Sequence, residues 1–268
     1  MATRASKTQA SRPTKPVTVR RDGDIAIVTL NRPEKRNALG DDMVALIDRF
    51  FSNPPADVRA VVITGSGDHF SAGLDLSTLR VRDVVEGMHH SRSWHAAFEK
   101  IQFGRVPVVA ALHGAVIGGG LELAAAAHVR VADATVFYAL PEGQRGIFVG
   151  GGGSARLPRL IGVACMTDMM LTGRVYKAEE GERLGFAQYL VAQGESLAKA
   201  IELARKMAGN AGMTNYAVMH ALPRIADASQ DMGLFTESLI ATVASSAPEA
   251  RERVQAFLQG RAAKVKAG

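Results

Sequence analysis

One segment of this 268-residue chain combines residue types that could do chemistry. Residues 113–124 read HGAVIGGGLELA, follow an apolar run at 106–112 and lead into a helix-like run at 121–127. Glycines at a strand-to-helix junction leave backbone N–H groups accessible, and a helix N-terminus adds partial positive charge at the same point. Glu122 lies one turn into this helix. The segment therefore predicts a site where a developing anion is held beside an acid or base.

The composition is typical of a soluble globular protein, with 47% hydrophobic and 22% charged residues. No window approaches 18 uninterrupted apolar residues, so we expect no membrane span. Cys165 is the single cysteine, which excludes an internal disulfide and a metal site built from several cysteines. It also favours a reducing compartment, and with no secretory signal expected we predict a cytoplasmic protein.

The net charge of +6 is concentrated at the two ends of the chain. Residues 1–21 carry six basic residues and no acid, and residues 261–268 carry three and no acid. Taking these nine from the 32 Lys and Arg leaves 23 against 26 Asp and Glu, so the body is close to −3. We therefore expect the fold itself not to bind a nucleic acid, because it is not a cationic surface. The first sixteen residues are typical of a solvated, disordered tail, since they lack the apolar face of a transit peptide.

The spacing of apolar residues predicts strands alternating with helices, followed by helices alone. The expected strands are at 24–30, 59–64, 106–112, 128–132, 135–139 and near 187–191. The expected helices are at 41–51, 81–103, 121–127, 162–171, 178–184, 196–209, 213–224, 232–245 and 248–259. We therefore divide the chain into a disordered basic tail at 1–16, an α/β core at 17–200 and a C-terminal helical region at 201–268.

Two other enzyme classes contain glycine-rich junctions of this kind. Gly114, Gly118 and Gly120 match the dinucleotide turn of short-chain dehydrogenases, but no tyrosine is followed four residues later by lysine. That turn would also lie near the start of the chain, not 110 residues into it. A serine hydrolase needs Gly-x-Ser-x-Gly, and Ser154 lacks the second glycine. Tight helix–strand packing is the remaining explanation for the glycines if they are considered alone.

Further motifs accompany the glycine segment along the chain. They are LNRPEKRNAL at 30–39, FSAGLDL at 70–76, Pro141-Glu142 followed by GGSARLPR at 152–159, and, more weakly, residues 178–186. Together with residues 113–122, these motifs make the chain resemble the crotonase (enoyl-CoA hydratase/isomerase) family over roughly residues 17–260, closest to the enoyl-CoA hydratases. Each motif alone is weak, whereas the set in this order is specific.

The resemblance implies an α/β fold of the crotonase (ClpP/crotonase-like) type, with repeated ββα units in a spiral sheet and a C-terminal helical trimerisation region. It implies a homotrimer or a dimer of trimers, and an acyl-CoA substrate of fatty acid metabolism. It also implies hydration of a 2-enoyl-CoA through an enolate-like state. Such a reaction needs no metal and no cofactor, because coenzyme A is part of the substrate.

The family's matching positions assign the catalytic groups. The backbone N–H groups of Leu74 and Gly119 correspond to an oxyanion hole, in which losing one donor typically costs about 3–4 kcal/mol. Glu122 and Glu142 match the two carboxylates of the hydratases. We predict that Glu122 orients and deprotonates water and that Glu142 delivers a proton to C2. The roles stay open at this point, because coupled acids share their titration.

The loop at 72–77 corresponds to the family's CoA-binding segment. The backbone carbonyls of Ala72 and Leu76 would contact the adenine, and Asp75 lies between them in the same substrate-binding loop. Three nearby bases could meet the phosphates or could be solvated surface charges: Arg32, Lys35 and Arg36. Ser77 stands where many relatives have lysine, which weakens a phosphate contact there.

The acyl specificity is less well defined. The expected helix at 81–103 matches the part of the family that shapes the acyl pocket, and Met88, Trp94 and Phe98 could line that pocket or belong to the core. Arg145 stands where relatives commonly have an apolar residue. It could pair with an acidic acyl group, lower the pKa of Glu142 or form a structural ion pair.

Two other functions remain as alternatives. Double-bond isomerisation can use an acid at the position of Glu142 alone, although the presence of Glu122 disfavours it. A nucleic-acid-binding protein is the other alternative, because the basic tail at 1–16 could contact RNA. The near-neutral body and the lack of interleaved aromatic residues make it the weaker one.

Overall fold

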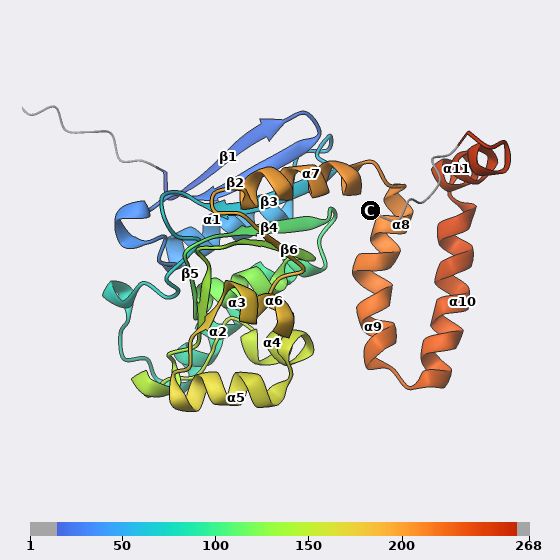
Figure 1. The fold of residues 1–268 in the computed structure, drawn as a ribbon. Coiled ribbons are helices and arrows are strands. Elements are labelled where there is room, and N and C mark those ends of the chain that lie inside the picture. Colours follow the sequence, from blue (N-terminus) through green and yellow to red (C-terminus); the bar gives the residue numbers. More distant parts are fainter. Residues whose placement is uncertain (1–14, 262–268) are drawn as a thin grey trace, which may run out of the picture.

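The computed structural model describes residues 15–261. The predicted tail at 1–16 therefore lies almost wholly outside the described residues. Within them, two sheets are flanked by helices, and the C-terminal helices extend away from the sheets (Figure 1).

The main sheet has six strands in the spatial order β1-β2-β3-β4-β6-β9. They are β1 (Val17–Asp22), β2 (Ile25–Leu30), β3 (Ala60–Gly65), β4 (Val108–Leu112), β6 (Val129–Asp133) and β9 (Tyr189–Val191). β1 and β2 pair antiparallel, whereas all other neighbours pair in parallel. β3 and β4 are almost entirely buried, as expected for parallel strands that helices cover on both faces.

Alternate residues of these strands face two separate layers of helices. On one face, α7 (Ser196–Ala208) packs its Ala200 and Ala204 against β2, β3 and β4. The other face packs against α1 (Asp41–Ser52), α2 (Val84–Gln102) and α3 (Gly119–Ala126). The predicted boundary between residues 200 and 201 is wrong, because it falls inside α7. This helix belongs to the core as one unit.

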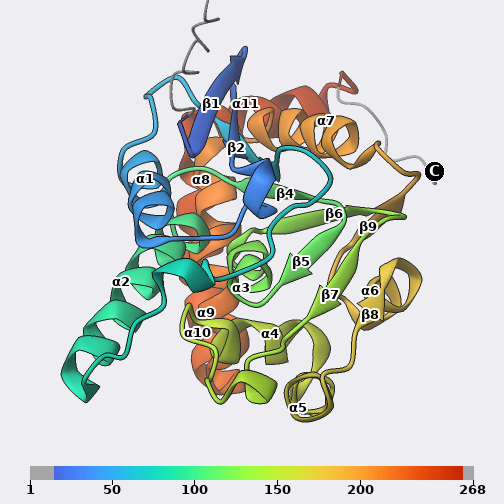
Figure 2. The same cartoon turned by 90° about the vertical axis from the view of Figure 1, so that its left-hand side faces the viewer.

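A smaller sheet brings the sequence motifs together. It consists of β5 (Ala115–Ile117), β7 (Phe137–Ala139) and β8 (Tyr176–Lys177), with β5 and β7 parallel. Two isolated bridges, Ser71 with Val116 and Leu39 with Leu74, fasten the 70–76 loop beside β5. The loop is therefore held by backbone pairing on two sides, next to the start of α3 (Figure 2).

The remaining elements connect these layers and form the C-terminal part. Helices α4 (Gly153–Ile161), α5 (Val163–Thr172) and α6 (Ala178–Leu184) follow the glycine loop. Short 3₁₀ turns are η1 (Pro33–Lys35), η2 (Leu76–Thr78) and η3 (Gly143–Arg145). The C-terminal elements are α8 (Gly212–Tyr216), the π-helical η4 (Ala217–Ala221), α9 (Leu222–Asp227), α10 (Gln230–Ser246) and α11 (Pro248–Leu258).

The C-terminal helices expose large apolar side chains. α9 and α10 run side by side and stand apart from the sheets (Figure 1). The exposed apolar residues on α10 and α11 include Met232, Leu234, Phe235, Leu239, Val243, Phe257 and Leu258. A helix pair with this much exposed apolar surface indicates contact with another surface.

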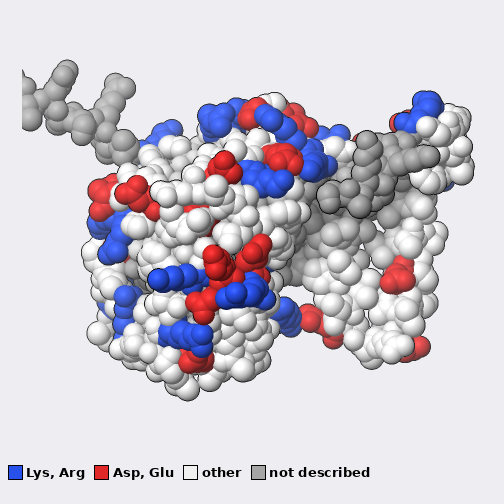
Figure 3. All heavy atoms as spheres, in the orientation of Figure 1, with Lys and Arg blue, Asp and Glu red and all other residues white. Residues whose placement is uncertain are grey.

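Most of the predicted elements are present. The strands β1, β5 and β8 and the helix α4 were not predicted, and α3 begins two residues earlier than predicted. α4 was missed because it begins at Gly153 and contains Pro158, which are weak helix formers. Basic and acidic side chains are interspersed on the face that Figure 3 shows, in keeping with the near-neutral body. Over the stretch from 15 to 261, no helix has the length and apolar character needed to cross a membrane.

Candidate active site

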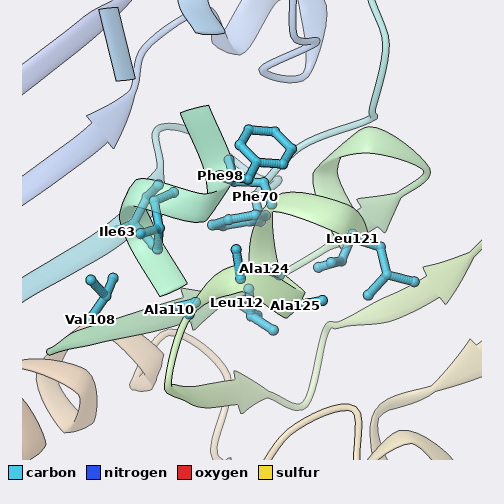
Figure 4. Packing of buried hydrophobic residues seen from close by; sticks show 14 of the residues in the cluster. Ile63, Phe70, Phe98, Val108, Ala110, Leu112, Leu121, Ala124 and Ala125 are labelled. Atoms are coloured by element: carbon cyan, nitrogen blue, oxygen red, sulfur yellow. The ribbon is translucent and has the colours of Figure 1, made fainter. Parts of the chain in front are cut away.

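α3 carries Glu122 into the interior. All eight residues of the helix are buried, and its small side chains pack closely against Phe70 and Phe98 (Figure 4). Gly118, at φ 49°, turns the chain from β5 into the helix in a conformation that favours glycine. Glu122 is only 3% exposed, and this burial raises the pKa of its carboxyl group. A carboxylate in such a place needs hydrogen-bond donors.

Two backbone groups of the glycine loop supply them. Oε1 of Glu122 accepts hydrogen bonds from the N–H groups of Gly151 and Gly153, each 2.8 Å long. A Cβ atom at Gly153 would lie 2.8 Å from Cγ of Glu122, and one at Gly151 would lie 3.1 Å from its Oε2. The loop is therefore rich in glycine because its backbone approaches a side chain this closely. These contacts fix Oε1 of Glu122, a residue that lines the cavity described below.

Side chains from two helices hold the same loop in place. Oγ of Ser91, on α2, donates a 2.6 Å hydrogen bond to the carbonyl oxygen of Gly150. Nη1 of Arg156, on α4, donates to the carbonyl oxygen of Gly151 at 3.1 Å. Sequence analysis did not assign either residue to the site. The dense glycines at 146–153 were the one signal that this loop approaches another group closely.

Glu142 lies at the start of η3. It is 8% exposed, and its Oε2 has no hydrogen-bond partner among residues 15–261. Burial raises the pKa of Glu142 to about 7, and the neighbouring charge of Glu122 adds to the rise, while Arg145 opposes it. The carboxyl group is therefore poised to exchange a proton near neutral pH. Its Oε1 lies 2.4 Å from the position that a Cβ of Gly118 would take, so this glycine makes room for the acid.

The backbone N–H groups of Leu74 and Gly119 lie close together. The bridge between Leu39 and Leu74 fixes the loop, with hydrogen bonds from Leu39 N–H to Gly73 and from Asp75 N–H to Leu39. A Cβ atom at Gly119 would lie 3.6 Å from the nitrogen of Leu74. Neither of the two N–H groups donates a hydrogen bond to any part of the described chain. They form a ready pair of donors for one oxygen atom.

These groups line a single cavity of about 330 Å³. Leu74, Gly119, Glu122 and Glu142 all contribute to it. The rest of the wall is formed by Leu79, Arg80, Arg82, Gly87, His90, Ser91, Trp94, Ile147, Phe148, Val149, Gly150 and Gly151. Wider hollows of about 750 and 760 Å³ elsewhere contain none of the predicted site residues. The cavity thus combines two acids of raised pKa with two unpaired backbone donors.

Comparison with known proteins adds an independent observation. The family model for enoyl-CoA hydratase/isomerase matches residues 20–267. This chain belongs to the enoyl-CoA hydratase/isomerase family. A short-chain-enoyl-CoA hydratase of Clostridium acetobutylicum is 31% identical to it over 248 residues, which span 91% of this chain and 95% of that protein.

Solved structures of the family have the same fold. One from Rhodopseudomonas palustris, provisionally described as an enoyl-CoA hydratase, is 60% identical with a TM-score of 0.90, covering 92% of this chain and 95% of its own. An enoyl-CoA hydratase from Bacillus anthracis is 28% identical with a TM-score of 0.85, covering 92% and 97%. These matches confirm the predicted family, the α/β crotonase fold and the assignment as an enzyme of this family.

The remaining predicted substrate-binding residues of this family member lie outside the cavity wall. Asp75 is buried and forms ion pairs of 3.1 Å with both Arg32 and Lys35. A hydrogen bond from Ser77, with a further contribution from Lys35, lowers the pKa of Asp75 to about 2. Asp75 therefore pairs with Arg32 and Lys35, two of the three basic residues predicted to meet phosphates, and partly neutralises their charge.

The two predicted carbonyl groups of the 72–77 loop differ in their surroundings. The carbonyl oxygen of Leu76 accepts a hydrogen bond from the N–H of Leu79 at 3.3 Å, and its side chain is exposed. Ala72 is pinned by a 2.9 Å hydrogen bond from its own N–H to the carbonyl of Arg36. A role of Ala72, Leu76 and Asp75 in binding CoA stays a prediction.

Two histidines near the site serve the fold. Nε2 of His113 lies 3.1 Å from the carbonyl oxygen of Gly67. His128 connects β4 to the end of α2, and its burial lowers its pKa to about 4. The part of the chain from 15 to 261 contains no cluster of three or more residues able to hold a metal. Arg145 forms no ion pair within that part; its backbone N–H donates to the carbonyl oxygen of Glu142 at 3.0 Å, and its charge lowers the pKa of that carboxyl group.

Proposed function

We propose that this protein is an enoyl-CoA hydratase that adds water reversibly to a 2-enoyl-CoA, giving a 3-hydroxyacyl-CoA. The observation that carries the proposal is the convergence of Glu122 and Glu142 on one cavity with the free N–H groups of Leu74 and Gly119. An isomerase can work with one acid. Two buried acids beside an oxyanion site suit a reaction that moves two protons.

In the proposed reaction, the thioester carbonyl oxygen lies between the N–H groups of Leu74 and Gly119. Water adds its oxygen to C3 while Glu122 takes up a proton, and the electron pair of the double bond moves toward the carbonyl oxygen. The resulting enolate-like state is stabilised by the two donors. Glu142, with its pKa near 7, then delivers a proton to C2.

The fixed position of Glu122 supports this division of roles. Oε1 is held by two backbone donors, so Oε2 is left to orient water. Glu142 has no donor on Oε2, and burial raises its pKa to about 7, so it can carry a proton at neutral pH. The proposed chemistry requires no group beyond the thioester and water, since coenzyme A belongs to the substrate.

The test is hydration of crotonyl-CoA and of longer enoyl-CoAs by the wild type, Glu122→Gln and Glu142→Gln. Each substitution should lower kcat by about 10²–10⁴, the usual contribution of a positioned acid or base. Glu179→Gln, at an exposed glutamate of α6, is the matched control and should keep full activity. Turnover that survives both active-site substitutions contradicts the proposal. Exchange of solvent deuterium into C2 without hydrated product would favour the isomerase instead.

We also propose a homotrimer or a dimer of trimers, with an acyl-CoA as the small-molecule partner. The exposed apolar residues of α10 and α11 support an assembly in which these helices are covered by another subunit. Light scattering coupled to gel filtration measures the mass directly, and a monomer at micromolar concentration contradicts the proposal. The cytoplasmic location and the absence of a nucleic-acid role stay predictions.

A further inference from the structure

Arg82 lines the catalytic cavity, and its guanidinium group has few partners for its position. The side chain is only 15% exposed, and its nearest acid is Asp41, whose Oδ2 lies 3.6 Å from Nη2. Throughout residues 15–261, its five N–H donors make no hydrogen bond. Shielded guanidinium groups normally have acceptors, so these donors are available to an acceptor in the cavity.

Arg82 is linked to Trp94 through Asp41, which contacts both side chains. Nε1 of Trp94 donates to Oδ1 of Asp41 at 3.1 Å, and Nε2 of His90 lies 2.7 Å from the same oxygen. The opposite edge of the indole reaches Gly119, where a Cβ atom would lie 3.1 Å from Cζ3 of Trp94. The indole therefore spans from the oxyanion donor to Asp41, and Arg82 lies at the Asp41 end. Arg82 and Gly119 therefore line the same cavity, linked through Asp41 and the indole of Trp94.

Several apolar residues share this cavity wall. They include Trp94, Leu79, Ile147, Phe148 and Val149, which suit the hydrocarbon part of an acyl group. A substrate that follows this wall from the oxyanion site meets a cation at its distal end. Arg80, the other guanidinium of the wall, is 63% exposed and pairs with Glu86 at 3.2 Å.

We propose that Arg82 binds a carboxylate at the distal end of the acyl chain, so that the preferred substrates are enoyl-CoA thioesters of dicarboxylic acids. The inference rests on the proposed hydratase function. A carboxylate on the substrate adds negative charge to a cavity that already contains Glu122 and Glu142, and this is costly unless a cation compensates for it. A planar guanidinium with free donors matches a carboxylate, which it can bind through two parallel hydrogen bonds.

A phosphate of coenzyme A would offer the same anionic oxygens. The shielded position of Arg82 in the cavity favours the acyl carboxylate, because a phosphate is bulkier and keeps more of its hydration. Arg32 and Lys35, on the other loop, are the bases nearer to the predicted CoA segment. The two sources of the anion are separated by the experiment below.

The experiment compares glutaconyl-CoA with its uncharged isostere, 5-methylhex-2-enoyl-CoA, in the wild type, Arg82→Met and Arg92→Met. The wild type should show a kcat/KM at least tenfold higher for glutaconyl-CoA. Arg82→Met should lower that value about 10- to 100-fold more than it lowers the value for the isostere, as expected for charge-assisted hydrogen bonds. Arg92, exposed on α2 and outside the cavity wall, is the matched control and should leave the ratio unchanged.

A binding measurement keeps the inference testable without turnover. Calorimetry should show that the saturated glutaryl-CoA binds the wild type at least tenfold more tightly than it binds Arg82→Met. Equal affinity, or a wild type that prefers the isostere, overturns the inference while leaving the hydratase proposal intact. Equal losses for both substrates, with weaker inhibition by free CoA, would show that Arg82 contacts CoA and would also overturn it. Failure to hydrate any enoyl-CoA contradicts the proposed function alone, because the glutaryl-CoA comparison still stands.

Discussion

Replacing Glu142 with glutamine should make the stability of this protein less sensitive to pH between about 5 and 8. In the folded state, burial raises the pKa of Glu142 to about 7 from its ordinary value of 4.5. A group whose pKa is raised by folding binds its proton more tightly in the folded state. It stabilises the fold fully below its unfolded pKa, and this contribution is lost as the pH rises through the folded pKa.

The expected size follows from that difference. One pKa unit corresponds to about 1.4 kcal/mol, so ionising Glu142 in place costs the fold about 3 kcal/mol. The wild type should lose that much free energy of unfolding between pH 5 and pH 8 through this residue, and Glu142→Gln should not. The glutamine amide also lacks a partner for its N–H groups. For this reason the informative quantity is the change with pH, not the offset at one pH.

Urea unfolding at pH 5 and pH 8 measures this change, at one protein concentration because assembly also contributes to stability. Because the two acids are charge-coupled, the comparison reports Glu142 together with the change that its loss causes in Glu122. Glu179→Gln, at an exposed site, should follow the wild type at both pH values. If Glu142→Gln loses as much stability as the wild type between pH 5 and pH 8, the reasoning about burial is refuted.

Three further outcomes are expected. Gly153→Ala should lower kcat about 10²-fold, because its Cβ would lie 2.8 Å from Cγ of Glu122 and displace that side chain. Gly212→Ala is the control and should keep wild-type kinetics, because a Cβ atom there would meet open space. Gly119→Pro removes one oxyanion donor at the first position of α3, where a helix tolerates proline. It should lower kcat about 10²–10³-fold and leave the circular dichroism spectrum unchanged. Activity near that of the wild type would exclude this donor. The rate of hydration should fall about tenfold per pH unit above about 7, as Glu142 loses its proton, and a flat profile to pH 9 would rule out Glu142 as the acid.

The secondary structure was largely predictable because the local pattern is strong. Alternating and continuous β-branched runs located β2, β3 and β4, and the 3.6-residue spacing located α1 and α7. The strands β5 and β8 are only three and two residues long, too short for any periodic signal. The break at Pro158 and the glycines before it concealed α4, which forms because its buried Leu157 and Ile161 pack against the core.

Local sequence patterns specify which chemical groups are available and which backbone positions can approach them. The motif residues specified Glu122, Glu142 and the junction before α3, since each lies within a local pattern of strand, glycine turn and helix. No such local pattern predicts which groups donate hydrogen bonds to Glu122. Its two donors follow it by 29 and 31 residues and reach it across the fold.

The chemical properties of the site depend on how the chain packs in three dimensions. The pKa of Glu142 depends on how deeply the packed chain buries it, and the free donors of Arg82 depend on what α2 and the preceding loop leave unpaired. The domain boundary was misplaced for the same reason, because α7 is assigned to the core by its contact with β3 and β4. Burial, hydrogen-bond satisfaction and charge coupling are set by atoms that are distant in sequence, and local periodicity carries no information about them.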